Sequence, residues 1–431
     1  MDQKLTDQII ALIKREVVPA VGCTEPVAVS LAVAKAVRLL GADFNDITAI
    51  RCTLSANIIK NAMGVGIPGT GMIGLPIAVA LGAICGDPDL GLEVLSKVTD
   101  ADVTAGKAFI SKNIISFTRA CADLGTLYVR VDIDTPGHTA MAEISGSHTN
   151  FTRLAVDGSP LPVSIGSAAD DNAADDTDTP LTFALVWEFA TTTPLDDLRF
   201  ILETRRLNKA AAEWALMDAY GHRVGRTLHS ERQRHVMGDS TFSRILSYTA
   251  AACDARMGGA PVAVMSNSGS GNQGIAATMP VVIYAEENYA NEEQTIRALI
   301  LSHLTSIYIK QHLGRLSALC GCVVATTGSS AGICFLMGGN YSQVAATIKN
   351  MAANLTGMIC DGAKPSCALK LTSGVSTAVI SAMMAMEGEE ATCMEGIIDA
   401  DIDRTVANFC AIGRDGMTQT DDLILSIMTA K

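Results

Sequence analysis

Three cysteines in the second half of the chain have a residue type and a setting that could bind a metal. Cys320, Cys360 and Cys367 lie 40 and 7 residues apart, among Gly, Pro and Asp residues that shape exposed loops. Thiolates in facing loops suit zinc or an iron–sulfur cluster, and three ligands would leave one coordination position open. No C-x-x-C pair is present, so buried structural thiols are the alternative.

A fourth cysteine, Cys23, has the setting of a reactive thiol. It lies between Pro19 and Pro26, directly before an apolar helix predicted over residues 27–40, which Thr24 could cap. The free N–H groups and the dipole at a helix start favour a thiolate, so Cys23 could be a nucleophile or a base. A small apolar residue in a tight turn is the competing interpretation.

Two glycine-rich segments carry side chains that could bind a small polar substrate. In residues 55–74, a predicted helix start after Gly69 and Thr70 would offer free N–H groups to a carboxylate, although a packing turn would have a similar composition. Residues 261–284 predict a polar loop for a small substrate. The candidate substrate-binding residues are Asn57, Lys60, Asn61, Gly69, Thr70, Ser268, Ser270, Asn272 and Gln273.

The second segment also matches a dinucleotide-binding motif. Gly269, Gly271 and Gly274 give G-x-G-x-x-G after an apolar run. That motif needs a helix after the glycines within a β-α-β unit, but Pro280 follows six residues after Gly274 and helical patterns stand where strands should be. We therefore expect a small substrate there, and a dehydrogenase is a weaker alternative.

The composition indicates a large, closely packed protein. Its 431 residues leave room for two or three domains, and hydrophobic residues make up 48% of them but aromatic residues only 4%. The net charge of −13, without a Lys/Arg run, argues against nucleic acid and anionic membranes as partners.

Several features predict a cytoplasmic protein. The mean hydropathy is positive, but no charge-free apolar run reaches the roughly 18 residues of a membrane span. Residues 2–17 predict an amphipathic helix without the apolar core of a signal peptide. The twelve cysteines should then be reduced, and Cys393 and Cys410 are expected in the core.

The periodicity predicts an α+β fold, with an N-terminal α/β portion that holds a small antiparallel sheet and a mainly α-helical C-terminal domain. Residues 47–54 predict a strand, and an antiparallel meander is predicted at 127–133, 139–145 and 150–156. Further helical patterns cover residues 86–118, 204–236, 292–311, 340–356 and 371–386.

Residues 166–180 predict an exposed acidic linker between two domains. The segment is low in complexity and has no large apolar residue, so it cannot bury a core. It lacks the Gly and the final Glu of a calcium-binding loop, which favours a solvated run of charge. The predicted domains are an α+β domain, residues 1–165, with the Cys23 turn, and a helical domain, residues 181–431, with the three cysteines.

Taken together and in this order, the motifs resemble those of the iron–sulfur L-cysteine desulfidase family, also called the serine dehydratase-like alpha-chain family. The resemblance covers essentially the whole chain. It rests on GCTEP at 22–26, IPGTG at 67–71, SGSGNQG at 268–274, LSALCGC at 316–322, and the pair Cys360 and Cys367.

The resemblance implies a lyase that acts without pyridoxal phosphate. Cys320, Cys360 and Cys367 would hold a [4Fe–4S] cluster with one iron open to the substrate as a Lewis acid, and Cys322 could replace Cys320. Cys23 would remove the α-proton of L-cysteine, and β-elimination would give pyruvate, ammonia and sulfide. Glu25, Lys60, His303 and Lys310 are secondary candidates for proton transfer.

Two other functions remain open at this point. The same cluster could serve an L-serine or L-threonine dehydratase, because the choice of leaving group depends on placement within about 1 Å. A non-enzymatic zinc-holding or thiol-packed protein is the second. The expected partner is a small amino-acid substrate, and a homodimer is an option that the sequence leaves open.

Overall fold

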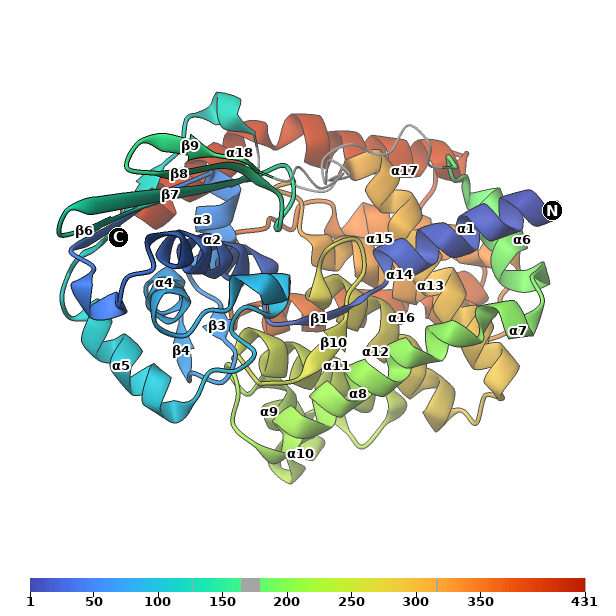
Figure 1. Ribbon diagram of the computed structural model, residues 1–431. Helices are drawn as coiled ribbons and strands as arrows, with labels where there is room; N and C mark the ends of the chain where they lie inside the picture. Colours follow the sequence, from blue (N-terminus) through green and yellow to red (C-terminus); the bar gives the residue numbers. More distant parts are fainter. Residues whose placement is uncertain (126, 164–178, 315–316, 431) are drawn as a thin grey trace.

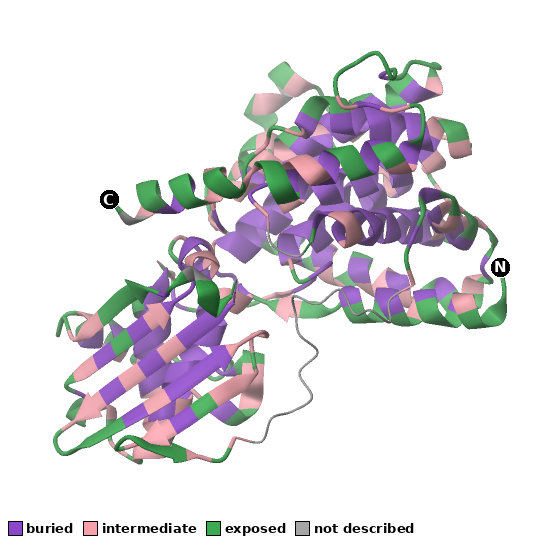
Figure 2. Cartoon of the chain, turned by 90° about the horizontal axis from the view of Figure 1, so that it is seen from above, coloured by how far each residue is buried: buried purple, intermediate pink, exposed green. Residues whose placement is uncertain are grey.

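The computed structural model describes residues 1–125, 127–163, 179–314 and 317–430. It confirms the α+β class, with an N-terminal unit built on a sheet and a C-terminal unit built of helices (Figure 1). Figure 2 shows the two units next to each other, each with its own buried interior.

The N-terminal unit contains a six-stranded sheet with the order β5-β2-β6-β7-β8-β9. Its strands are β2 Ala49–Leu54, β5 Ile115–Arg119, β6 Tyr128–Thr135, β7 His138–Ser145, β8 Phe151–Val156 and β9 Ser159–Leu161. The predicted meander is confirmed as β6, β7 and β8, and the alternate residues Val129, Val131 and Ile133 of β6 are buried.

The prediction of a purely antiparallel sheet needs one correction. β2 pairs with β5 in parallel, so the sheet is mixed, and β5 lies in the stretch 86–118 that was expected to be mainly helical. A parallel pair needs a long crossover connection, and the helices between these two strands provide it.

The helices of the N-terminal unit lie in layers on this sheet. They are α2 Thr24–Leu40, α3 Ala56–Ala62, α4 Leu75–Ile84 and α5 Asp100–Ile110. α2 packs on β6 and β7, α4 packs on α2, and α5 packs on α4. The hydroxyl of Ser30 in α2 donates to the carbonyl oxygen of Ala78 in α4 at 2.8 Å, which joins the two buried helices.

Residues 55–74, predicted as a loop that leads to a helix start after Gly69, contain a helix and a hairpin instead. These elements are α3, β3 Gly66–Ile67 and β4 Met72–Ile73. Gly69 and Gly71 have φ angles of 74° and 63°, which the tight turn between β3 and β4 requires. α4 begins only at Leu75, so the free N–H groups of a helix start are not located at Gly69 and Thr70.

The C-terminal unit is a helical bundle arranged around α14. Its helices are α6 Phe183–Thr192, α7 Leu195–Leu198, α8 Leu202–Met217, α9 Val224–His229, α10 Arg234–Met237, α11 Thr241–Met257, α12 Gly271–Glu287, α13 Glu292–Leu313, α14 Gly321–Leu336, α15 Tyr341–Leu355, α16 Cys367–Met386 and α17 Ile402–Ala411. α14 packs against α12, α13, α15 and α16. Gly328 of α14 permits a close approach to α13, because a Cβ there would lie 2.3 Å from the carbonyl oxygen of Ser302.

Pro280 lies inside α12, so the expectation that it interrupts a helix after Gly274 is wrong. A proline removes one backbone hydrogen bond from a helix. α12 is buried along nearly its whole length, and packing on α8, α11 and α14 compensates for that loss.

Both ends of the chain cross from one unit to the other. α1 (Gln3–Glu16) packs on α13, and β1 (Pro19–Val21) forms an antiparallel pair with β10 (Ala263–Met265). α18 (Thr418–Thr429) returns to α3, and its Leu425 lies in the core of the N-terminal unit. These crossings hold the Cys23 turn, which follows β1, against the C-terminal unit.

Three further predictions concern linker, membrane and thiol positions. Residues 166–180 lie outside the described residues except for the last two, so the domain division there stays a prediction. Among the described helices, α16 alone is long and apolar enough to cross a membrane, but half of its apolar window is buried in the protein, as in a core helix. Cys410 is buried as predicted, whereas Cys393 is exposed in the turns between α16 and α17, so the prediction of a core thiol is wrong there.

Candidate active site

A cavity of about 860 Å³ lies between the two units. The predicted site residues that line it are Cys23, Asn57, Lys60, Asn61, Ser268, Ser270, Asn272, Gln273, Cys320, Cys360 and Cys367. Gly69 and Thr70 are not among the described residues that line it. They lie in the β3–β4 turn, where the Thr70 hydroxyl donates to the carbonyl oxygen of Ile67 at 2.7 Å. Their predicted role as the carboxylate site therefore has no support from their position.

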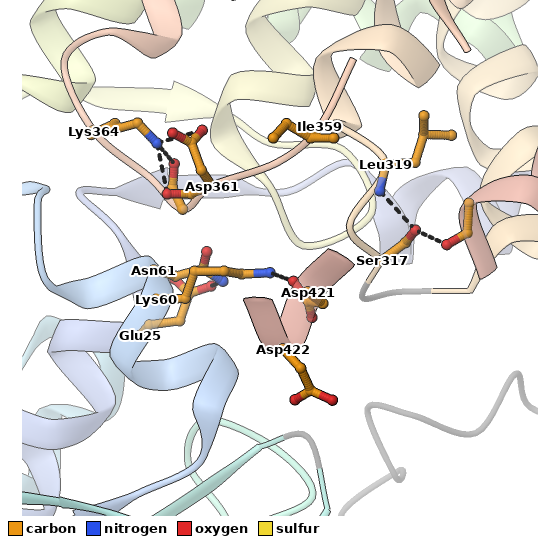
Figure 3. Close-up of polar contacts among 12 residues, drawn as sticks. Glu25, Lys60, Asn61, Ser317, Leu319, Ile359, Asp361, Lys364, Asp421 and Asp422 are labelled. Atoms are coloured by element: carbon orange, nitrogen blue, oxygen red, sulfur yellow. Dashed lines mark hydrogen bonds and ion pairs between the residues drawn. The ribbon is translucent and has the colours of Figure 1, made fainter. Parts of the chain in front are cut away.

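The backbone holds the cysteine-bearing loops side by side. The N–H of Cys320 donates to the carbonyl oxygen of Met358 at 3.0 Å, and the N–H of Cys360 donates to that of Ala318 at 2.6 Å. Leu319 and Ile359 form an antiparallel bridge, and Figure 3 shows them on neighbouring segments. Cys320 is the N-cap of α14 and Cys367 is the first residue of α16. Two helix starts and one loop thus bring three thiols to the same wall.

Three thiols on one cavity wall have the donor chemistry that an iron–sulfur cluster requires. Among the described residues, no three His, Cys, Asp or Glu side chains converge closely enough to hold one ion, as a zinc site would require. The thiol of Cys320 hydrogen-bonds with that of Cys360, so these two thiols lie side by side. Cys322 also lines the cavity, and its thiol hydrogen-bonds with that of Cys320, so both remain candidates for the third ligand.

Cys23 lines the same cavity at the start of α2 and is hydrogen-bonded to a carboxylate. It is 3% exposed and is the N-cap of α2, the position expected for Thr24. Its thiol donates to Oε2 of Glu25 at 2.8 Å, and Oε1 of Glu25 accepts from the side-chain amide of Asn61 at 3.0 Å. Figure 3 shows Asn61 and Glu25 together at the edge of α3.

The charges around this pair place the proton on sulfur. Burial, and then the negative charge of Glu25, raise the pKa of the Cys23 thiol well above its ordinary value, although Arg256 lowers it. Burial also raises the pKa of Glu25, but His148 and the hydrogen bond from Cys23 outweigh burial and hold it below its ordinary value. The resting pair is therefore a thiol and a carboxylate, and the helix start does not by itself give the expected thiolate.

Lys60 binds a protein carboxylate. Its side chain is 4% exposed, and Nζ forms an ion pair with Asp421 of α18, as Figure 3 shows. The Lys60 carbonyl oxygen also lies against Gly362, where an added Cβ would be 2.1 Å from it. Lys60 thus connects α3, α18 and the loop that carries Cys360.

His303 is a core residue. In the part of the chain that the structure describes, it does not line the cavity. Its Nδ1 is 3.1 Å from the amide nitrogen of Asn267, and its Nε2 is 3.0 Å from the hydroxyl of Thr278, whose own proton goes to the Gly274 carbonyl oxygen. These partners fix a neutral ring that accepts at Nδ1 and donates at Nε2. Burial lowers the pKa of His303 to about 3, and its hydrogen bonds support the Asn267–Ser270 turn.

Two residues that line the cavity were not identified from the sequence. Arg256, at the end of α11, donates from Nη1 to Oδ1 of Asn272 at 3.1 Å, and His148, between β7 and β8, lowers the pKa of Glu25. A single Arg in the small-residue segment 250–259 was the signal for the first. No motif pointed to His148. Lys310, a secondary candidate, also lines the cavity.

Comparison with known proteins matches the chain to one family. The family profile of the serine dehydratase alpha chain matches residues 89–426, which include the three cysteines and Arg256. The chain is 58% identical to a UPF0597 protein of Bacteroides fragilis over the full length of both chains, and 50% identical to one of Porphyromonas gingivalis, also full length. It is 46% identical to a UPF0597 protein of Oleidesulfovibrio alaskensis over 98% of this chain and 97% of that one. The turn with Cys23 lies outside the matched profile but inside these full-length alignments.

Proposed function

The chain belongs to the serine dehydratase alpha-chain family, and from this premise we propose that it is a lyase that converts L-cysteine to pyruvate, ammonia and sulfide without pyridoxal phosphate. Family membership indicates a dehydratase-like lyase, and the choice of L-cysteine is our proposal. One observation carries it: a thiol–carboxylate pair and three cysteine thiols line the same cavity from opposite units.

Cys320, Cys360 and Cys367 would hold a [4Fe–4S] cluster at the cavity wall. When bound, such a cluster supplies a Lewis-acidic iron that can accept the departing sulfur. The backbone pairing of the Cys320 and Cys360 loops would hold two of these ligands in place.

The proton transfers are assigned to residues of this chain. Glu25 takes the thiol proton of Cys23 along their 2.8 Å hydrogen bond, and the thiolate then removes the Cα proton of L-cysteine. The C–H electron pair forms the Cα–Cβ double bond while the Cβ–S bond breaks. Sulfide leaves as aminoacrylate forms, which tautomerises to the imine and reacts with one water to give pyruvate and ammonia. Asn61 and His148 stabilise the ionised Glu25 beforehand.

L-Serine dehydration is the second candidate, because the matched family bears that name. The same residues would act, with water as the leaving group. We expect either activity to take place in the cytoplasm, where the thiols stay reduced, and a homodimer is the assembly that we would test first.

The proposed function is tested by product analysis of protein purified without oxygen. Release of sulfide and pyruvate in equal amounts from L-cysteine, with a smaller kcat/KM for pyruvate release from L-serine, is the expected result. A larger kcat/KM with L-serine would assign the dehydratase activity. No product from either amino acid with cluster-loaded protein would contradict both.

A further inference from the structure

Arg256 is a buried cation at the cavity whose charge no protein carboxylate balances directly. Its side chain is 6% exposed, and it lines the cavity between the units. Nη1 donates to the neutral Oδ1 of Asn272, while Nε is buried with no acceptor, and Arg256 forms no ion pair among the described residues. A guanidinium stays charged in a protein, and burying an unpaired charge is costly. A bound anion would remove this cost.

The start of α12 lies directly against the guanidinium. A Cβ on Gly271, the first residue of α12, would lie 2.3 Å from Nε of Arg256, so only glycine permits this contact. The hydroxyl of Ser270 caps the N–H of Gln273, and the helix leaves the N–H groups of Gly271 and Asn272 without helical partners. Free N–H groups and the positive end of the helix dipole attract anions. The cation and the helix start thus face the same space.

The location of Arg256 in the same cavity as the proposed base limits which kind of anion would bind there during the reaction. Arg256, Cys23 and Glu25 line the same cavity, and the positive charge of Arg256 acts on both of the other residues. A carboxylate bound by Arg256 would lie in the cavity that Cys23 also lines. Pairing that carboxylate with a cation also makes the adjacent C–H more acidic, since it offsets the charge that opposes carbanion formation.

We propose that Arg256, with Asn272 and the N-terminus of α12, binds the α-carboxylate of the substrate, and that the cavity therefore selects small α-amino acids with a free carboxylate. This inference deepens the proposed function and rests on it for the identity of the reacting carbon. It replaces the Gly69–Thr70 turn, the first candidate for this role, with a residue of the other unit.

The test measures binding without turnover. L-Alanine has the amine and the carboxylate but no leaving group, and L-alaninamide lacks the negative charge. Calorimetric titration of both into cluster-loaded protein should show that wild type prefers L-alanine. Arg256→Gln should lose roughly 10- to 100-fold in affinity for L-alanine and lose this preference, as expected for a charged hydrogen bond. Arg256→Lys should retain part of the affinity for L-alanine and part of the preference for it over L-alaninamide.

The matched control is Arg244→Gln, which removes an arginine from the exposed side of the same helix, where it pairs with Asp239 and Glu287. It should bind like wild type. A folded Arg256→Gln protein that binds L-alanine as tightly as wild type would overturn the proposal. If that variant does not fold, the wild-type protein provides the test. Equal affinity of wild type for L-alanine and L-alaninamide would also overturn the proposal.

The outcomes separate this inference from the proposed function. Arg256-dependent binding of L-alanine, in a protein that releases no product from L-cysteine or L-serine, would support the carboxylate site and reject the lyase. Normal turnover of L-cysteine by Arg256→Gln, with unchanged KM, would reject the carboxylate site and leave the lyase in place.

Discussion

At the residue scale, Cys23 and Glu25 share one hydrogen bond of 2.8 Å, and the surrounding charges decide where its proton lies. Burial keeps the proton on Cys23, while His148 and Asn61 keep Glu25 ionised. A base that is protonated at rest must be activated inside the complex. Glu25 is the group in contact with Cys23 that can do so, and the two residues act as one unit.

Glu25→Gln should lower kcat by about 10²- to 10⁴-fold, because an amide cannot take the thiol proton. Iron content and KM should change little. Glu93→Gln, which alters an exposed carboxylate at the same cavity, is the control and should retain wild-type kcat. Steady-state kinetics on both variants check this, and near-normal kcat in Glu25→Gln would exclude Glu25 as the proton acceptor.

The pH profile should reflect the two shifted pKa values. The active form has an ionised Glu25, and its pKa is lowered, so kcat should hold as the pH falls and decline only below the ordinary Glu value of about 4.3. The pKa of Cys23 is raised, so kcat should show no rise through about pH 8.5, where an ordinary thiol ionises. A kcat that increases with pH through that region would mean that a preformed thiolate is required.

At the element scale, α18 ties the C-terminal end of the chain to the N-terminal unit beside the site. Its Asp421 pairs with the buried Lys60 of α3 (Figure 3). The next residue, Asp422, pairs with the exposed Arg119 of β5. Lys60 in turn packs on the loop of Cys360 through Gly362. The two neighbouring aspartates thus form a buried and an exposed ion pair on the same helix.

Asp421→Asn should destabilise the protein by about 1–3 kcal/mol, because it leaves a buried ammonium group without its counter-charge; Asp421 itself is partly exposed, which limits the effect. Asp422→Asn should change stability by less than about 0.5 kcal/mol, since its ion pair is solvated. Urea unfolding midpoints of the two variants provide the comparison. Equal shifts would show that Lys60 does not depend on Asp421.

At the scale of the whole molecule, neutral buried groups make stability depend on pH. The pKa of His303 is about 3 in the folded protein and near 6.5 in an unfolded chain, because burial disfavours the charged ring. Between these values the unfolded state binds one more proton, so this residue lowers stability as the pH falls from 6.5 towards 3.

His303→Gln tests this dependence. The variant should be less stable than wild type at pH 7, where hydrogen bonds to Asn267 and Thr278 are perturbed. The difference in unfolding free energy between wild type and the variant should narrow by about 2 kcal/mol at pH 5, because only wild type carries the titrating ring. Urea unfolding at the two pH values measures this difference. Equal losses of stability between pH 7 and pH 5 in wild type and His303→Gln would contradict a neutral His303.

Periodic and local features were predictable from the sequence. The amphipathic pattern of residues 2–17 and the alternation of the β6–β8 meander depend on nearest neighbours and became the expected elements. α3 was not predictable, since seven residues before a glycine-rich turn give too short a pattern. Pro280 led to the wrong prediction of a helix break, because the burial of α12, and not the helix propensity of its residues, stabilises that helix.

The composition of the site was predictable in part, and its assembly was not. Cys23 and the three cysteines were named as a set from the resemblance to a family. The crossing that brings them to one cavity is the pairing of β1 with β10, two strands of three residues each. Its central pair, Ala20 and Val264, is 244 positions apart, and nothing in the patterns of the two strands marks them as partners. Arg256 was missed because its proposed partner is a ligand, and a single Arg in a small-residue segment does not by itself identify that ligand.

The central claim is that three thiols hold the cluster while Cys23 serves only the chemistry. The most direct measurement is iron and acid-labile sulfide per chain, together with sulfide release from L-cysteine, for wild type, Cys23→Ala and Cys360→Ala purified without oxygen. We expect about four iron and four sulfide per chain in wild type and in Cys23→Ala, with turnover lost in Cys23→Ala, and loss of both cluster and turnover in Cys360→Ala. A fully active Cys23→Ala, or a wild-type protein that holds no iron after reconstitution, would contradict this account.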